Sequence, residues 1–281
     1  MSDSLTLPQP TGGFAWVQAP AGPALVSRAL EPLADHLFTT RAWALGSAVP
    51  ATDADWQQVA AALDVDLAHL VRVRQVHGAS VVVCRDGDAR VGASHARMTE
   101  ADIIVSNDPS LAIAIQTADC VPLLIADART GAVAMAHAGW RGLAARVPSV
   151  AVDALARELG SRSVDLIAAI GPSISADRYA VGADVRARFE ASGFSAAQID
   201  RWFRHGDRPE HWSFDGWRSA RDQLEAAGLR PSNIHVAALC TASHPDLLCS
   251  YRRDGQNAGR IAAAIRARRP SPHSPADRRA R

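Results

Sequence analysis

Apolar and polar positions follow two different periods along the chain, and this pattern predicts a mixture of strands and helices. Strict alternation is typical of half-buried strands, whereas apolar residues spaced three or four apart are typical of amphipathic helices. Strands are predicted over residues 71–77, 80–84, 101–106, 111–116, 121–127, 132–136, 164–170 and 234–239. Helices are predicted over residues 53–63, 143–159, 180–191, 219–227 and 258–268. Hairpins mixed with helices indicate an α+β fold rather than a doubly wound parallel sheet.

Cap and turn residues mark several of these boundaries. Thr52 or Asp53 is suited to cap the first predicted helix. Residues 128–131 predict a tight turn that joins the two strands on either side of it into a hairpin. Pro148 lies inside the helix predicted over 143–159, so it either kinks that helix or marks its true start.

The chain is expected to form one domain over residues 25–268. Residues 1–24 are rich in Pro, Gly and small polar residues and are expected to be a loose lead-in. Residues 269–281 combine prolines with charged residues and are expected to be a disordered tail. We find no internal repeat and no linker between these two ends.

Charge and cysteine content exclude several classes of protein. The chain has 30 Lys plus Arg against 29 Asp plus Glu, a near-neutral balance that argues against a nucleic-acid or membrane-surface binder. No stretch of 18 uncharged apolar residues exists, and the start lacks the features of a signal peptide. Four cysteines without a CxxC pair indicate free thiols and a cytoplasmic location. The oligomeric state is left open.

Three residues stand out as candidate metal ligands: His77, Cys120 and His137. Each lies at the end of a predicted strand, and 43 and then 17 residues separate them, so only the fold could bring them together. Two imidazoles and one thiolate suit zinc, one ligand short of a closed tetrahedral site, and a free position is typical of a catalytic metal. The alternative is that each is an ordinary core residue, as an isolated His or Cys in an apolar stretch usually is.

Neighbouring polar residues offer further chemistry. Asp119 is a candidate to orient a histidine ligand or to act as a general base, although it could equally be a turn residue that caps its own backbone. Arg141 lies in the segment Ala138–Gly142, which follows His137 and opens a predicted helix; there it could bind an anion or pair with a surface carboxylate. Of Arg252 and Arg253, only one can enter a given pocket, and we favour Arg252; both could instead be surface cations.

Together these signatures resemble one family over about residues 25–268. It is known as the YfiH family, the polyphenol oxidase or laccase-domain family, and the peptidoglycan editing factor family. The matching segments are Phe38–Arg41, Arg74–Gly78, Ala101–Val105, Thr117–Pro122, His137–Gly142, Ile170–Ile174, Tyr179–Gly182, Cys240–Thr241 and Ser250–Asp254. Their order and number make the resemblance specific.

The resemblance implies a four-layer α/β/β/α fold of mixed sheets and zinc, or else copper, on the three candidate ligands. It also implies phosphorolysis of purine nucleosides (adenosine, inosine, guanosine and S-methyl-5'-thioadenosine), with adenosine deamination as a side activity. Substrate and phosphate would then contact Arg41, Gln75, Arg141 and Arg252. One departure concerns the loop after Arg41, which reads Ala42–Gly46 in place of the family's Gly-rich sequence, so the substrate preference is open.

Three alternatives to a nucleoside phosphorylase are a laccase, a Cys-His hydrolase or editing factor, and a non-enzymatic module. A multicopper laccase needs many imidazoles, often as His-x-His pairs, and the ten histidines of this chain include no such pair. A Cys-His hydrolase or editing factor acting on peptidoglycan precursors would use Cys120 as its nucleophile. A non-enzymatic module that holds a metal or binds such precursors is the third alternative.

Overall fold

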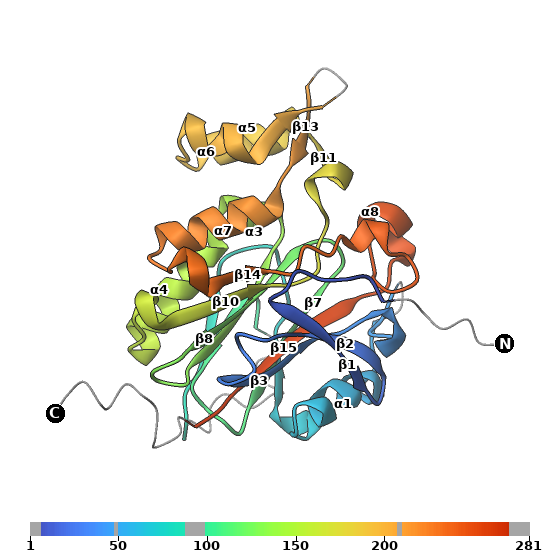
Figure 1. Cartoon of the computed structure of the whole chain (residues 1–281), viewed down its shortest axis with the longest axis vertical. Coiled ribbons are helices and arrows are strands. Elements are labelled where there is room, and N and C mark those ends of the chain that lie inside the picture. The colour runs from blue at the N-terminus through green and yellow to red at the C-terminus, as the bar shows by residue number, and fades with distance from the viewer. Residues whose placement is uncertain (1–6, 48–49, 88–98, 207–209, 270–281) are drawn as a thin grey trace.

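The computed structural model describes residues 7–47, 50–87, 99–206 and 210–269, and these ranges contain two six-stranded sheets and one three-stranded sheet (Figure 1). The first sheet has the strand order β1-β2-β3-β15-β7-β4. Its strands are β1 (Phe14–Ala19), β2 (Gly22–Ser27), β3 (Ala34–Phe38), β15 (Ile261–Ala267), β7 (Ala112–Thr117) and β4 (Leu70–Arg72). Neighbours are antiparallel except β4 and β7, which are parallel.

The second sheet has the order β14-β10-β8-β9-β6-β5. Its strands are β14 (Ile234–Val236), β10 (Leu166–Ile170), β8 (Val121–Asp127), β9 (Val133–Ala138), β6 (Ile103–Ser106) and β5 (Val81–Cys84). Two of its pairs are parallel, β10 with β14 and β5 with β6, and the others are antiparallel. The predicted hairpin is confirmed, because β8 and β9 pair across the turn at 128–131.

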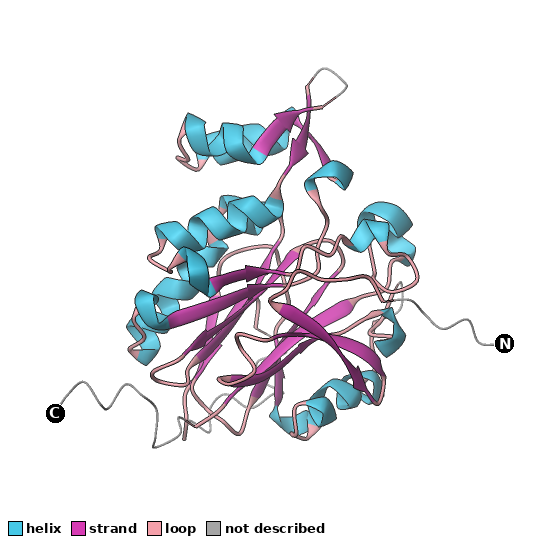
Figure 2. Ribbon diagram, in the orientation of Figure 1, coloured by secondary structure: helices cyan, strands magenta, loops and turns pink. Residues whose placement is uncertain are grey.

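The two large sheets pack face to face, and helices cover their outer faces (Figure 2). Helix α1 (Asp53–Ala62) covers the first sheet through Trp56, Val59 and Ala60. Helices α4 (Val147–Leu159) and α7 (Gly216–Ala226) cover the second sheet, so the predicted α/β/β/α order is confirmed. None of the helices in the described ranges is long and apolar enough to cross a membrane.

The third sheet extends the layer outside the second sheet. It contains β11 (Ala180–Gly182), β13 (His211–Phe214) and β12 (Phe203–His205), with α5 (Ala183–Ala191) and α6 (Ala196–Trp202) packed on it. Its core is aromatic, with the Phe189 ring in contact with several others. This core is continuous with the one beneath α4, so the two parts form a single domain.

Three sequence predictions are corrected by the fold. The helix predicted over 258–268 is wrong: this segment contains β15, a strand between β3 and β7 whose alternate residues face opposite layers. The loose lead-in predicted over 1–24 is wrong for β1 and the start of β2, which pair at the edge of the first sheet. The helix predicted over 180–191 begins with the strand β11.

Two predictions about helix starts can also be compared with the fold. Thr52 is the N-cap of α1, where its side chain and Asp55 form a capping box. Pro148 lies in the first turn of α4, where a missing N–H costs nothing, so it marks a helix start and not a kink. The tail prediction falls outside the described residues from 270 onward.

Candidate metal centre

The fold brings the three predicted metal ligands together. His77 lies in the loop after β4, Cys120 in the turn between β7 and β8, and His137 in β9. Their ligand atoms all lie within 4.8 Å of one another, and the two imidazole rings meet edge to face with centroids 4.8 Å apart. The centre therefore forms where the ends of strands from both large sheets converge.

Two residues at the centre, the candidate ligand His77 and the neighbour of Cys120, have unusual backbone conformations. His77 has φ +61° and Asp119, next to Cys120, has φ +87°, although neither is glycine. Such conformations cost roughly 1–3 kcal/mol each and persist where the surrounding structure requires them. Both tight turns aim a ligand at the same point, which is consistent with a functional site.

The buried carboxylate of Asp102 orients both histidines. One of its oxygens accepts a hydrogen bond from Nδ1 of His137 at 2.7 Å and from the main-chain N–H of His77 at 3.0 Å. The other accepts from the N–H groups of Val76 at 3.2 Å and Gly78 at 2.7 Å. With Nδ1 of His137 engaged, Nε2 is left to coordinate a metal.

Asp102 was not singled out from the sequence, although it lies within one of the segments that resemble the family. The only signal was an acidic residue beside the apolar stretch that becomes β6, since Asp102 is fully buried and its neighbours are hydrophobic. A buried carboxylate needs several hydrogen-bond donors, so its position already indicates a structural or functional requirement.

Gly139 allows the ligands to pack closely. A Cβ atom at this position would lie 2.7 Å from Sγ of Cys120 and 3.2 Å from Cδ2 of His77. Gly139 is also the N-cap of the short helix α3 (Trp140–Ala144), which follows directly from β9. The glycine therefore lets the start of α3 lie against the metal centre.

Cys120 and His137 shift each other's pKa. Burial acts to raise the pKa of Cys120, but the charges and hydrogen bonds of His137 and His77 outweigh it and lower this pKa to about 6. Burial acts to lower the pKa of His137, but Cys120 and Asp102 outweigh it and raise this pKa to about 9. Without a metal, the pair is therefore a thiolate and an imidazolium near neutral pH.

The donor set fits one divalent metal ion. A thiolate and two imidazoles suit zinc and also accommodate copper. Zinc–ligand bonds of 2.0–2.3 Å place tetrahedral ligand atoms about 3.5 Å apart, so small side-chain adjustments suffice from the observed spacing. In the described residues this is the one cluster of three or more potential ligands.

Asp119 was predicted as a candidate to orient a histidine, but its side chain binds two other segments instead. Its Oδ1 accepts a hydrogen bond from the Thr241 hydroxyl at 2.5 Å, and its Oδ2 accepts one from the main-chain N–H of Arg252 at 2.6 Å. These bonds join the turn that carries Cys120 to the 3₁₀ turn Thr241–Ser243 and to the short helix α8 (Tyr251–Asp254). The orienting residue is Asp102, whereas a general-base role for Asp119 stays a prediction.

The three arginines that were predicted to bind phosphate differ in the partners that their side chains already have within the protein. Arg41 pairs with Asp254 at 2.9 Å. Arg252 donates from Nη1 to the carbonyl oxygen of Ala180 at 2.7 Å. Arg141 is exposed and stacks on Trp140, with its Cζ 4.3 Å from the ring centroid; it has no hydrogen-bond acceptor in the part of the chain that the structure describes. Arg141 is therefore the most available of the three.

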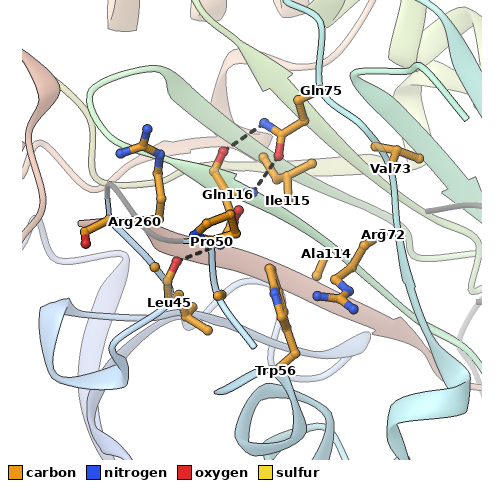
Figure 3. A pocket seen from close by; sticks show the side chains of 13 residues that line it. Leu45, Pro50, Trp56, Arg72, Val73, Gln75, Ala114, Ile115, Gln116 and Arg260 are labelled. Atoms are coloured by element: carbon orange, nitrogen blue, oxygen red, sulfur yellow. Dashed lines mark hydrogen bonds between the residues drawn. The ribbon is translucent and has the colours of Figure 1, made fainter. Parts of the chain in front are cut away.

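Gln75 fixes the loop that carries His77 and borders a cavity. Its amide donates to the carbonyl oxygen of Gln116 and accepts from the N–H of Gln116, both at 2.8 Å (Figure 3). The cavity beside this pair measures about 390 Å³ and is also lined by Leu45 and Arg260. Its volume lies in the range of small-molecule sites. The loop that departs from the family's Gly-rich sequence thus forms part of its wall.

Comparison with known proteins agrees with this architecture. The structure of YfiH from Bacillus licheniformis is similar, with a TM-score of 0.81 and 27% identity, and the match covers 92% of this chain and 100% of that one. A purine nucleoside phosphorylase of Deinococcus radiodurans is 35% identical over 208 residues, which is 74% of each chain. An adenosine deaminase, RL5, from an unidentified prokaryote is 33% identical over 206 residues, which covers 72% of this chain and 77% of that protein.

The sequence profile of one family matches most of the chain. This family is described as multi-copper polyphenol oxidoreductase laccase. The match spans residues 44–268, which include all three candidate ligands. The two relatives with enzyme names match 74% and 72% of this chain, and the YfiH structure matches 92% of it. The protein thus belongs to the laccase-like family of YfiH.

Proposed function

We propose that this protein is a zinc-dependent purine nucleoside phosphorylase with adenosine deaminase activity as a side reaction. The observation that carries the proposal is the His77, Cys120 and His137 cluster, whose three donors leave one coordination position open. The names of two relatives, purine nucleoside phosphorylase and adenosine deaminase, support the choice of reaction. Adenosine, inosine, guanosine and S-methyl-5'-thioadenosine are the proposed nucleosides.

In phosphorolysis, a phosphate oxygen attacks the anomeric carbon of the ribose while the bond to the purine breaks. The products are the free base and ribose 1-phosphate. Negative charge moves onto the departing base, and a bound zinc ion would supply a Lewis acid beside the reacting groups. Asp102 holds the ligands in place before substrate arrives, so no reorganisation is needed during the reaction.

Cationic side chains at the centre suit the phosphate co-substrate. The exposed guanidinium of Arg141 lies in the helix whose N-cap, Gly139, touches the ligands, and it has the fewest competing partners. Arginine binds phosphate in a planar, bidentate manner, which fixes the direction from which the oxygen attacks. For the deamination, Asp119 is the proposed group that moves protons.

The proposal is tested by incubating the zinc-loaded protein with inosine, with and without phosphate. We expect hypoxanthine and ribose 1-phosphate only when phosphate is present. His137→Ala should lose both the bound zinc and the turnover. Absence of both products with zinc and phosphate supplied would refute the proposal, and turnover retained in His137→Ala would remove the metal from the reaction.

A second candidate function is favoured by one specific observation. In the metal-free state, the thiol of Cys120 has its pKa lowered to about 6 beside a charged His137, which is the arrangement of a nucleophilic cysteine. A Cys-His hydrolase or an editing factor acting on peptidoglycan precursors would use this pair. Alkylation by iodoacetamide distinguishes the two functions: zinc should protect Cys120 in a phosphorylase, whereas a hydrolase should be inactivated by the reagent and work without metal.

A further inference from the structure

Tyr179 lies beside the metal centre but has no part in the function described so far. It precedes β11, and its ring packs against Phe214 with centroids 5.9 Å apart. Its carbonyl oxygen accepts a hydrogen bond from the N–H of Phe214 at 3.0 Å. These contacts anchor Tyr179 to the third sheet and its aromatic core, so the side chain is held in one place.

The Tyr179 ring supports the guanidinium of Arg252. The Cζ atom of Arg252 lies 5.0 Å from the ring centroid, which is within the range of a cation–π interaction. The same arginine is held at two further points, by the carbonyl oxygen of Ala180 and through its main-chain N–H by Asp119. Since Asp119 is next to Cys120, the pair of Tyr179 and Arg252 is fixed close to the metal ligands.

The hydroxyl of Tyr179 has no hydrogen-bond partner in the part of the chain that the structure describes, although most of its ring is out of water. Burial raises the pKa of Tyr179, the charges of Cys120 and Asp119 raise it further, and those of Arg252 and Arg141 oppose them. The hydroxyl therefore stays protonated, and the charges that act on it come from three segments: the turn with Asp119 and Cys120, α8 with Arg252, and α3 with Arg141. A phenol in such a place needs a water or a ligand as its partner.

We propose that the Tyr179 hydroxyl, together with the guanidinium groups of Arg141 and Arg252, forms a subsite for a phosphate group. Two cations and one neutral donor match a ligand that offers only acceptor oxygens. Asp119, the carboxylate that binds the main-chain N–H of Arg252, already accepts a hydrogen bond at each of its two oxygens. The inference rests on the proposed function, because phosphate is the co-substrate of that reaction.

The chain offers a matched control, since Tyr251 is its one other tyrosine and the side chain is 52% exposed. Calorimetry of the zinc-loaded protein measures the Kd of inorganic phosphate for wild type, Tyr179→Phe and Tyr251→Phe. Losing one hydrogen bond to a charged ligand should weaken phosphate binding about tenfold or more in Tyr179→Phe. Tyr251→Phe should bind phosphate as wild type does.

Kinetics separate a binding role from a structural one. In Tyr179→Phe we expect a raised KM for phosphate, with the KM for inosine and the zinc content unchanged. A change of less than twofold in both the Kd and the KM of phosphate overturns the inference, as does an equal rise of both KM values with loss of zinc. If the wild type shows no phosphorolysis, the proposed function fails, and the calorimetric comparison still decides the phosphate subsite.

The phosphate could be free or carried by a nucleotide, and the same variant distinguishes the two sources. Binding of inosine 5'-monophosphate is measured beside that of inorganic phosphate. Weakening confined to inorganic phosphate identifies the free co-substrate, and weakening confined to the nucleotide identifies a phosphate attached to the nucleoside. Unchanged binding of both ligands overturns the subsite.

Discussion

Replacing Gly139 with alanine tests whether close packing at the metal centre is what permits coordination. The added methyl group would lie 2.7 Å from Sγ of Cys120 and 3.2 Å from Cδ2 of His77. Gly139 has φ −67° and ψ 175°, a conformation that alanine adopts without strain. The substitution therefore adds a steric contact with two ligands and leaves the backbone preference satisfied.

The size of the effect follows from the distances. Non-bonded heavy atoms settle at about 3.5–4.0 Å, so the Cys120 sulfur must move by about 1 Å to accommodate the new methyl group. Metal–ligand distances tolerate only about 0.2 Å of deviation. Because the required displacement is several times larger, we expect zinc affinity to fall by about 100-fold or more, beyond the usual range for residues outside the ligand set.

The assay is competition for zinc against a chelator, together with the metal content after dialysis. Gly12→Ala is the matched control, because a Cβ at Gly12 meets no atom within 4 Å. Thermal unfolding of both metal-free variants should resemble that of the wild type, which separates loss of metal from loss of fold. Stoichiometric zinc bound by Gly139→Ala with unchanged affinity would refute the steric account.

Three further predictions concern the surroundings of the ligands. Asp102→Asn replaces one carboxylate oxygen with an NH₂ group, which cannot accept hydrogen bonds from the N–H donors around it. Zinc affinity, measured by chelator competition, should therefore fall about 10- to 100-fold. Unchanged affinity would contradict the role of Asp102 in orienting the histidines. Between the pKa of Cys120, about 6, and that of His137, about 9, the cysteine is a thiolate and the histidine is protonated. Zinc must displace the one proton on His137, so zinc affinity should rise about tenfold per pH unit in this range. Competition titrations at several pH values check this, and a flat profile contradicts it. Asp119→Asn should lower the free energy of unfolding by about 1–2 kcal/mol in urea denaturation and retain zinc, whereas loss of zinc would make Asp119 part of the metal centre.

The sequence grouped three candidate metal ligands because each of them ends or follows a predicted strand and is marked by a turn or a glycine. Strand-end residues gather at sheet edges, so His77, Cys120 and His137 could be grouped before their positions in space were known. The same alternation of apolar and polar residues predicted most strands of the two large sheets. The strand pattern depends on local sequence, whereas the choice of these three residues as metal ligands also drew on the resemblance to the YfiH family.

The supporting residues depend on contacts between distant segments. Asp102 and Asp119 are both acids at the edge of an apolar strand, and only the tertiary structure shows that the first orients the histidines while the second fastens α8. Tyr179 likewise comes close to the ligands through the third sheet. Nothing in the sequence around these residues distinguishes their roles.

The sequence by itself predicted three candidate metal ligands and the mixed α+β character of the chain. Tertiary structure alone decided that Ile261–Ala267, which lies within the helix predicted over 258–268, is a strand. Its alanines fill the narrow spaces on both faces of the first sheet, and pairing with β3 and β7 satisfies its backbone. Helix propensity is worth a fraction of a kcal/mol per residue, about 0.5 on average, so burial and pairing in the sheet outweigh it.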